Sequence, residues 1–176
     1  MNVDKTHIVL VNKQDKVTGY KEKFAAHKIP VLLHRAISVV ILDPAGKKML
    51  LQKRAAVKPT WPLFWSNACC THPHKNESYL ACAERRIREE MGFEADLTEI
   101  FRFIYRADYD GVWGEHEYDV VFEGRYQGKV KPNPEEAADW KWMEVKELLG
   151  DVKNNPRIYT PWFKIILEKL YDVKDT

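Results

Sequence analysis

The hydrophobic positions of this chain follow two spacings, one typical of strands and one typical of helices. A β-branched, apolar run over residues 31–42 predicts a buried strand, and the turn at 43–46 leads to a partner strand, KMLLQKR. The apolar run 8–11, followed by NKQDKVTGY, predicts a hairpin. LTEIFRFIYRA and HEYDVVFEGRY alternate as two more strands around DYDG, and KPNPEEAADWKWMEV is expected to be a loop that leads to another strand.

Two segments have the spacing of helices. Residues 76–92 predict one helix, with Asn76 expected as its N-cap and Gly92 just beyond its C-terminus. The tail TPWFKIILEKLYDV predicts another, with Pro161 in its first turn. We therefore expect a single α/β domain over residues 1–176, in which helices cover a mixed sheet. The apolar faces expected for these helices are Leu80, Ala83, Ile87 and Met91, and Trp162, Ile165, Ile166 and Leu170, with Lys169 interrupting the second.

Composition and charge limit the class of protein. A chain of 176 residues is long enough for one domain with a real core. The net charge of +2, from 28 basic and 26 acidic residues, does not predict a nucleic-acid binder. The apolar runs stay well short of the roughly 20 residues that span a bilayer, and the N-terminus lacks the layout of a signal peptide. Three cysteines, two of them adjacent, do not suggest a disulfide framework, so we expect a cytoplasmic protein with reduced thiols and no membrane partner.

Acidic and histidine side chains raise the question of a metal site. Glu115 and Glu117 stand two residues apart in GEHEYDVVF, so on a strand they share one face and repel each other. A solvent-facing strand end is the ordinary explanation, and a metal ion between them is the other. His27, His34 and His72 would complete a site suited to Zn, Mn or Fe, whereas carboxylates alone suit Mg. These residues are scattered in sequence, and a lone strand histidine is more often part of the core, so their spacing leaves both explanations open.

The first predicted helix resembles the box of the Nudix hydrolases. That box reads Gly, five residues, Glu, seven residues, Arg-Glu, an aliphatic residue, any residue, Glu-Glu, any residue, Gly. Here Thr71 takes the place of the first Gly, and Arg86 that of the Glu after the Arg. The resemblance implies the Nudix fold and a diphosphate ligand, which Arg86 would hold directly, and it weakens the case for hydrolysis. A solvated charged helix face is the alternative. The matching positions are Glu77, Arg85, Ile87, Glu89, Glu90, Gly92 and Phe93.

Nearly the whole chain resembles the type 1 isopentenyl-diphosphate isomerases, a branch of the Nudix superfamily. The likeness rests on KFAAH with His34 seven residues beyond His27, and on KRAAVKPTWPLFWSNACCTHPH, RRIREEMG, YRA, GEHEYDVVF and TPW. The resemblance implies a Nudix-like mixed sheet between α-helices. It also implies an isomerase that interconverts isopentenyl and dimethylallyl diphosphate. Such an enzyme adds a proton to one carbon and removes a proton from another, through a tertiary carbocation.

The resemblance assigns the proton-transfer groups. The family has its catalytic cysteine two residues before a ligand histidine, which matches Cys70 with His72 and leaves Cys69 without that role. Cys70 and Glu117 would exchange protons on opposite faces of the substrate, with Tyr105 hydrogen-bonded to Glu117. The remaining catalytic residue implied is Trp162, whose ring would face the carbocation.

The resemblance also implies ligands for metal ions and for the diphosphate. One divalent ion (Zn, Mn or Mg) would occupy a site of histidines and glutamates, and a second ion, Mg, would bridge Glu90 and the diphosphate. The small diphosphate substrate is the partner expected, and nothing calls for more than a monomer. The implied residues are His27, His34, His72, Glu115 and Glu117 for the first ion, and Lys23, Arg54, Lys58 and Arg86 for the diphosphate.

Two other functions are compatible with parts of the sequence. A Nudix pyrophosphohydrolase would use the same helix and metal ions, but Arg86 at a box position and Cys70 beside His72 argue against it. A zinc-binding interaction module could be built on the crowded segment ACCTHPH. Structural zinc sites normally pair their ligands as Cys-x₂₋₄-Cys and His-x₃₋₅-His, which adjacent cysteines fit poorly.

Overall fold

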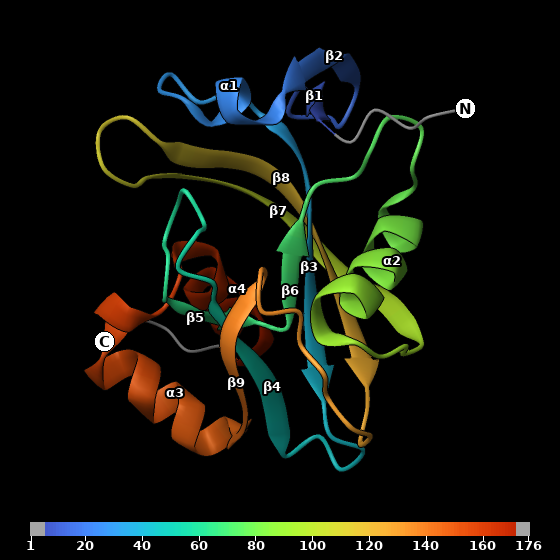
Figure 1. The fold of residues 1–176 in the computed structure, drawn as a ribbon, viewed down its shortest axis with the longest axis vertical. Coiled ribbons are helices and arrows are strands. Elements are labelled where there is room, and N and C mark those ends of the chain that lie inside the picture. The colour runs from blue at the N-terminus through green and yellow to red at the C-terminus, as the bar shows by residue number, and fades with distance from the viewer. Residues whose placement is uncertain (1–5, 172–176) are drawn as a thin grey trace.

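Strand β3 (His34–Leu42) is the centre of the sheet, because it pairs with four other strands (Figure 1). The computed structural model describes residues 6–171, and the nine strands found there form one mixed sheet. Strand β3 is parallel to β8 (Gly114–Arg125) along its whole length and antiparallel to β1, β4 and β6. The other strands are β1 (His7–Val11), β2 (Val17–Glu22), β4 (Lys48–Arg54), β5 (Trp65–Asn67), β6 (Cys69–Thr71), β7 (Leu97–Asp108) and β9 (Ala137–Glu144).

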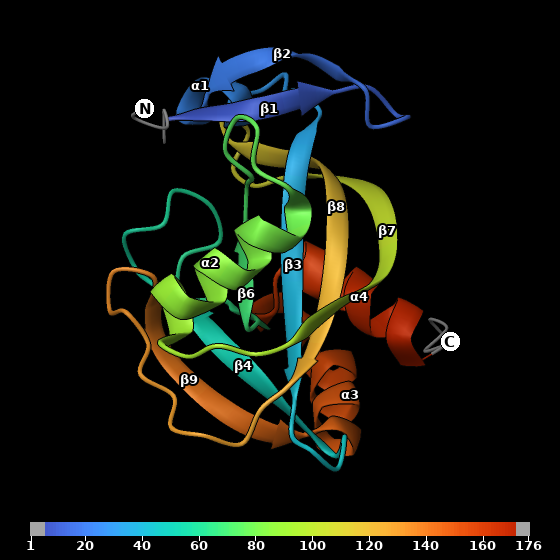
Figure 2. The same ribbon diagram turned by 90° about the vertical axis from the view of Figure 1, so that its right-hand side faces the viewer.

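Helices cover both faces of this sheet, as expected for the fold class. The helix α2 lies against one face and α4 against the other, while β1, β2 and α1 lie across the end of the sheet at which β3 begins (Figures 1 and 2). None of the helices among residues 6–171 combines the length and the apolar composition needed to cross a membrane. The helices are α1 (Lys23–His27), α2 (Tyr79–Met91), α3 (Val145–Asn154), the 3₁₀ turn η1 (Pro156–Ile158) and α4 (Pro161–Tyr171).

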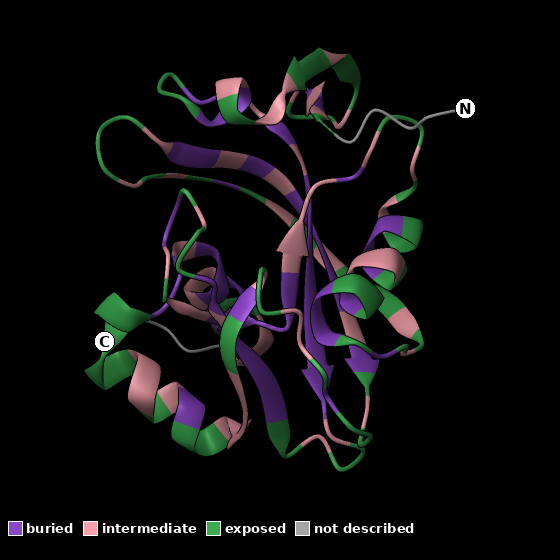
Figure 3. Ribbon diagram, in the orientation of Figure 1, coloured by how far each residue is buried: buried purple, intermediate pink, exposed green. Residues whose placement is uncertain are grey.

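The alternation of side chains along β3 divides the core in two. Ile37, Val39 and Ile41 pack with α2 on one face. Val40 and Leu42 pack with α3 and α4 on the other. Successive strand residues point to opposite faces, so one apolar strand supplies both halves of the core, and β3 is buried along nearly all of its length (Figure 3).

Outside residues 131–145 the predicted strands are confirmed, with shifted ends, and the first helix begins later than expected. The segment 131–145 was wrongly predicted to be a loop before a strand, because it contains β9 itself and is followed by α3. The buried strand starts at His34 rather than at residue 31. The N-cap of α2 is Ser78, whose hydroxyl accepts a hydrogen bond from the Ala81 N–H at 3.1 Å. Asn76 was the wrong choice, because its φ of 65° places it in a left-handed turn before the helix. Gly92 ends the helix as predicted, with a φ of 75°.

The predicted apolar faces of the helices are partly wrong. Leu80 is exposed, and Cys82 is buried on α2 instead. On α4 the buried face includes Phe163 and Leu167, whereas Ile165 and Leu170 are only half-buried. The short elements α1, α3, β5 and β6 were not predicted from the sequence. The helix α3 has a single fully buried residue, Leu148, so its apolar stripe is too thin to stand out in the sequence.

We expect the substitution Gly92→Ala to lower the free energy of unfolding by about 1–3 kcal/mol. A Cβ at this position would sit in the left-handed region and 2.4 Å from the Lys131 carbonyl oxygen. Urea unfolding measures the loss. The matched control is Gly150→Ala in the middle of α3, where an added Cβ meets nothing within 4 Å. That change should be neutral or stabilising by up to about 1 kcal/mol, and equal losses in the two variants would contradict the account.

Candidate active site

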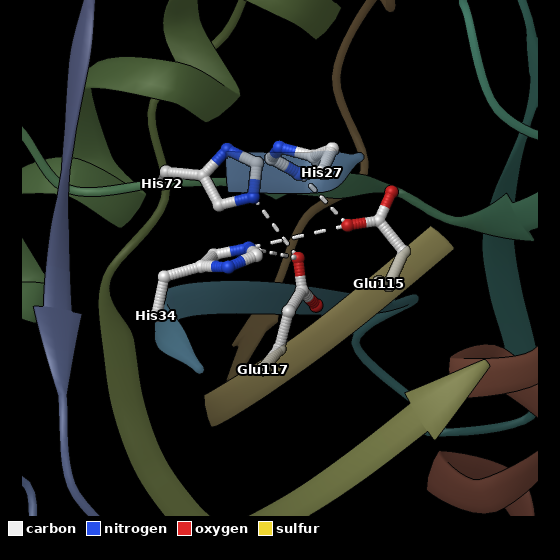
Figure 4. Close-up of side chains that lie close together, drawn as sticks. All are labelled: His27, His34, His72, Glu115 and Glu117. Atoms are coloured by element: carbon white, nitrogen blue, oxygen red, sulfur yellow. Dashed lines mark hydrogen bonds and ion pairs between the residues drawn. The ribbon is translucent and has the colours of Figure 1, made fainter. Parts of the chain in front are cut away.

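Five side chains from four places in the fold meet at one end of β3. The parallel pairing places His34 beside Glu117, and the two-residue period of β8 puts Glu115 on the same face. His27 is the last residue of α1, and His72 directly follows β6. Figure 4 shows these side chains pointing toward one another. They are all at most part-exposed, so the explanation of Glu115 and Glu117 as a solvent-facing strand end is wrong.

The distances within this His/Glu cluster are those of a site for a single ion. One ligand atom from each of the five residues lies within 4.8 Å of all the others. His27 Nε2 is 2.9 Å from Glu115 Oε2, and His72 Nε2 is 3.0 Å from Glu117 Oε1. His34 Nε2 lies 3.6 Å from Glu117 Oε1. A cluster of three imidazoles and two carboxylates is a donor set that suits a divalent transition metal.

Hydrogen bonds to the backbone aim two of the imidazoles inward. His27 Nδ1 lies 2.6 Å from the Lys23 carbonyl oxygen, and His34 Nδ1 lies 2.7 Å from that of Leu32. Each Nδ1 is therefore held by a backbone carbonyl, which leaves each Nε2 facing the cluster, as in ligating histidines. His34 Nε2 and Glu115 Oε2 are buried and make no hydrogen bond among the described residues. Buried polar atoms left in this state fit a metal ion as their missing partner.

Mutual charge sets the protonation of the cluster. Burial, together with the neighbouring His34, lowers the pKa of His72 well below its ordinary value, so this imidazole is neutral. Burial alone would raise the pKa of Glu115, but the His27 imidazole outweighs it and lowers that pKa. Burial alone would also raise the pKa of Glu117, but the nearby His34 imidazole, 3.6 Å away, and the hydrogen bond from Tyr105 lower it. Ionised carboxylates and a neutral imidazole are the forms that bind a metal.

Glu117 also contacts a residue outside the His/Glu cluster. Its Oε1 faces His72, and its Oε2 accepts a hydrogen bond of 2.6 Å from the Tyr105 hydroxyl. Burial and the nearby Glu117 carboxylate raise the pKa of Tyr105 well above its ordinary value, so the phenol keeps its proton and donates. One carboxylate thus contacts both the candidate metal ligands and a fixed proton donor.

The two adjacent cysteines point to opposite faces of the sheet. Strand β6 pairs with β3, and Cys69 is fully buried in the core beneath α2. Cys70 packs on the opposite side and lines the cavity. Its sulfur accepts a hydrogen bond of 2.8 Å from Trp162 Nε1, and burial, with the nearby Asp119 carboxyl, raises the pKa of the thiol to about 12. Of the two thiols, only that of Cys70 faces the cavity that the cluster borders.

A cavity of about 280 Å³ joins these groups, near the lower end of the roughly 300–1,000 Å³ typical of small-molecule sites. Its wall holds both an apolar and a cationic part. Of the residues predicted for the site, His34 lies behind the wall, and Glu90 is also outside it, buried against Gln52 and Arg86. The other predicted residues line the cavity: Lys23, His27, Arg54, Lys58, Cys70, His72, Arg86, Tyr105, Glu115, Glu117 and Trp162.

The cationic side of the cavity contains a residue that the sequence did not reveal. Glu136, in the loop before β9, pairs with Lys58 and lies 2.9 Å from Arg86 Nη2. Burial alone would raise its pKa, but the ammonium of Lys58 and the guanidinium of Arg86 lower it to about 2. Arg54 is fixed differently, since its guanidinium donates to the backbone oxygens of Thr60 and Trp61. No local motif marks Glu136, because its partners are 78 and 50 residues away in sequence.

Comparison with known proteins identifies relatives along most of the chain. Residues 32–163 match the family model of the NUDIX domain. The chain is 41% identical over 163 residues to isopentenyl-diphosphate Delta-isomerase 2 of Aromatoleum aromaticum, covering 93% of this chain and 85% of that one. It is 40% identical to the isopentenyl-diphosphate Delta-isomerase of Serratia proteamaculans and 42% identical to that of Nocardia farcinica, with at least 90% of each chain covered.

Solved structures support the same fold. A protein of Deinococcus radiodurans superposes with a TM-score of 0.77 at 16% identity, over 94% of this chain and 99% of the other. A MutT NUDIX hydrolase of Burkholderia pseudomallei superposes with a TM-score of 0.63 at 18% identity, over 78% of this chain and 98% of the other. At these identities the likeness concerns the fold, and the predicted Nudix-like architecture is confirmed.

We expect Glu136→Gln to lower the free energy of unfolding by about 1–3 kcal/mol at neutral pH, because Lys58 and Arg86 lose their shared carboxylate. The folded pKa of Glu136 is depressed from 4.5 to about 2. Its contribution is therefore complete above pH 4.5 and disappears as the pH falls toward 2. Urea unfolding of both proteins across this range should show the difference shrinking. Glu135→Gln, at the exposed neighbouring position, is the control and should change little; a difference independent of pH would refute the ion-pair explanation.

Proposed function

Because this chain belongs to the NUDIX domain family and, within it, to the isopentenyl-diphosphate Delta-isomerases, we propose that it interconverts isopentenyl diphosphate and dimethylallyl diphosphate. The observation that carries the proposal is that Cys70 and Glu117 line one small cavity and that each is held by its own hydrogen-bond donor. An allylic shift of a double bond needs two proton-exchanging groups around one substrate, and a hydrolase has no such need.

The proposed reaction moves a double bond in two proton transfers. A proton added to the terminal CH₂ carbon of isopentenyl diphosphate leaves a tertiary carbocation, and loss of a proton from the adjacent CH₂ group gives the dimethylallyl isomer. Cys70 and Glu117 exchange these protons on opposite faces of the carbon chain. Tyr105 keeps Glu117 oriented through its hydroxyl.

The cation formed between these steps has no heteroatom beside it, so the cavity wall must stabilise it. The ring of Trp162 offers an electron-rich face, worth roughly 0.5–2 kcal/mol to a nearby cation. Trp162 is almost completely buried, and Trp61 packs edge-on against it with ring centroids 5.4 Å apart. A rigid, dry wall of this kind also keeps water away from the carbocation, which water would otherwise capture.

The charged residues of the site fall into two groups, one that would bind metal ions and one that would bind the diphosphate. The His/Glu cluster described above would hold one divalent ion, Zn, Mn or Mg, which would fix Glu117 in place and lower the affinity of this carboxylate for its proton. Glu90 would hold a second ion, Mg, together with the diphosphate. Lys23, Arg54, Lys58 and Arg86 would bind the diphosphate oxygens. The monomeric state, the cytoplasmic location and the lack of nucleic-acid or membrane partners stay predictions.

We expect the metal-loaded protein, incubated with isopentenyl diphosphate in heavy water, to form dimethylallyl diphosphate with deuterium in the carbon skeleton. Proton exchange with side chains that equilibrate with solvent is the reason for the incorporation. Proton and phosphorus NMR follow the products. Release of phosphate or pyrophosphate without isomerisation would sink the proposal in favour of a Nudix pyrophosphohydrolase.

Exchanging the two thiols separately tests the assignment of Cys70. Cys70→Ala should reduce kcat by at least about 100-fold, because one proton-exchanging group is lost. Cys69→Ala removes a buried sulfur from the core beneath α2, so it should cost about 1 kcal/mol of stability and leave kcat within a few-fold. Steady-state kinetics and urea unfolding separate these effects. The reverse ranking of the two variants would show that the wrong cysteine has been assigned.

A further inference from the structure

The sulfur of Cys70 has a second close polar neighbour, which the likeness to the isomerases does not assign. Cys70 Sγ lies 3.1 Å from the side-chain oxygen of Asn67, in addition to its contact with Trp162. Asn67 is the last residue of β5 and is fully buried. A buried amide three residues before a thiol needs a reason, because burying an amide costs free energy unless each of its polar atoms is satisfied.

The orientation of the Asn67 amide is fixed by its own hydrogen bonds. Its NH₂ group donates to the backbone oxygens of Val39, at 3.2 Å, and Cys69, at 2.8 Å. Backbone carbonyls only accept, so the nitrogen must face them and the oxygen must face Cys70. The hydroxyl of Ser66 donates to the same oxygen at 3.0 Å. The amide therefore cannot flip without breaking two bonds to β3 and β6.

These constraints determine the direction of the thiol proton. An amide oxygen only accepts, so the S–H bond of Cys70 points at Asn67. An indole N–H only donates, so a lone pair of the sulfur points at Trp162. Ser38 Oγ and Ser66 Oγ are more distant from the sulfur, at 3.6 and 3.8 Å, so the Asn67 oxygen at 3.1 Å is the nearest acceptor for the thiol proton. Two uncharged groups on opposite elements, β5 and α4, thus hold the sulfur in one orientation.

We propose that Asn67 is a positioning residue for the isomerisation, which holds the Cys70 thiol in a single rotamer and a single proton direction within the cavity. This inference rests on the proposed catalytic role of Cys70. A proton moves efficiently between sulfur and carbon only over a short distance and a narrow range of angles. Without Asn67 the thiol rotates about its Cα–Cβ and Cβ–S bonds, and the productive geometry becomes one of several.

The test is the infrared S–H stretching band of Cys70, assigned by subtracting the spectrum of Cys70→Ala. In the wild-type protein this band should lie below that of a thiol without an acceptor, because hydrogen bonding weakens the S–H bond. Asn67→Leu keeps the branched shape of the side chain and removes the oxygen, so the band should move to higher frequency. Asn67→Asp keeps an oxygen there and should restore the low frequency. The bands of Cys69 and Cys82, in the core beneath α2, serve as internal controls and should stay in place.

Kinetics complete the test. Asn67→Leu should lower kcat by about 10- to 100-fold while KM stays within about threefold, since the diphosphate contacts are untouched. Asn67→Asp should recover a substantial part of kcat. If Asn67 only ties β5 to its neighbours, both variants lose its NH₂ donors and should be equally impaired, which would overturn the proposal. An unmoved band in Asn67→Leu would overturn it as well.

Two outcomes separate this inference from the proposed function. If Asn67→Leu does not fold, the wild-type spectrum still decides, because a Cys70 band at the frequency of an unbonded thiol rules out the Asn67 contact. Full turnover by Cys70→Ala would remove the catalytic role of Cys70 and with it the purpose of the positioning. A shifted band with unchanged kcat in Asn67→Leu would overturn the positioning role alone.

Discussion

Two carboxylates of one strand are buried side by side in this protein, and much of the surrounding structure makes that burial tolerable. Isolated, a buried pair of like charges is strongly unfavourable. Here Glu115 and Glu117 face three imidazoles, and Tyr105 and Thr60 donate hydrogen bonds to their outer oxygens. The compensating groups come from α1, β3, β7, the loop between β4 and β5, and the residue after β6. These parts must all be in place before the carboxylates are satisfied.

The two-residue period of the strands places the polar side chains of the site on one face of the sheet, just as it separates the two halves of the apolar core. On β3 and β8 the side chains packed against α2 include Ile37, Val39, Val120 and Phe122. Those on the other face include His34, Ser38, Glu117 and Asp119. The polar groups continue the same strand faces that bury Val40 and Val121 further along. Cys70, Tyr105 and Glu117 therefore all lie on strands, which suits a reaction whose protons must travel along fixed directions.

Local sequence patterns predicted most of the fold, and resemblance to a family predicted a large part of the site. Apolar runs located β1 to β4, β7 and β8, and Gly92 marked the end of α2 correctly, because these signals are local. Asn76 was mistaken for the N-cap because Ser78, two residues on, is an equally good capping residue. The members of the His/Glu cluster came from resemblance to a family, since spacing alone does not show that residues 27 and 117 meet.

Neither the local sequence patterns nor the family resemblance identified Glu136 or Asn67 as residues of the site. The partners of Glu136 lie far away in sequence, and an asparagine next to a strand looks like a turn residue until its hydrogen bonds are known. Such residues contribute through one or two contacts that only the folded chain creates. Each contacts residues already assigned to the site: Glu136 contacts Lys58 and Arg86, and Asn67 contacts Cys70.

The register of the short pairing between β6 and β3 decides which side chains of β6 and of the residue after it reach the site. Moving β6 by one residue would exchange the environments of Cys69 and Cys70, so a thiol would still reach the cavity. With Cys69 in the place of Cys70, Thr71 would occupy the position of His72. The imidazole of His72 would then lie away from the other residues of the His/Glu cluster. A shift in register would therefore still place a thiol in the cavity, but it would remove His72 from the cluster. A chain with the shifted register would be recognisable by its loss of metal affinity.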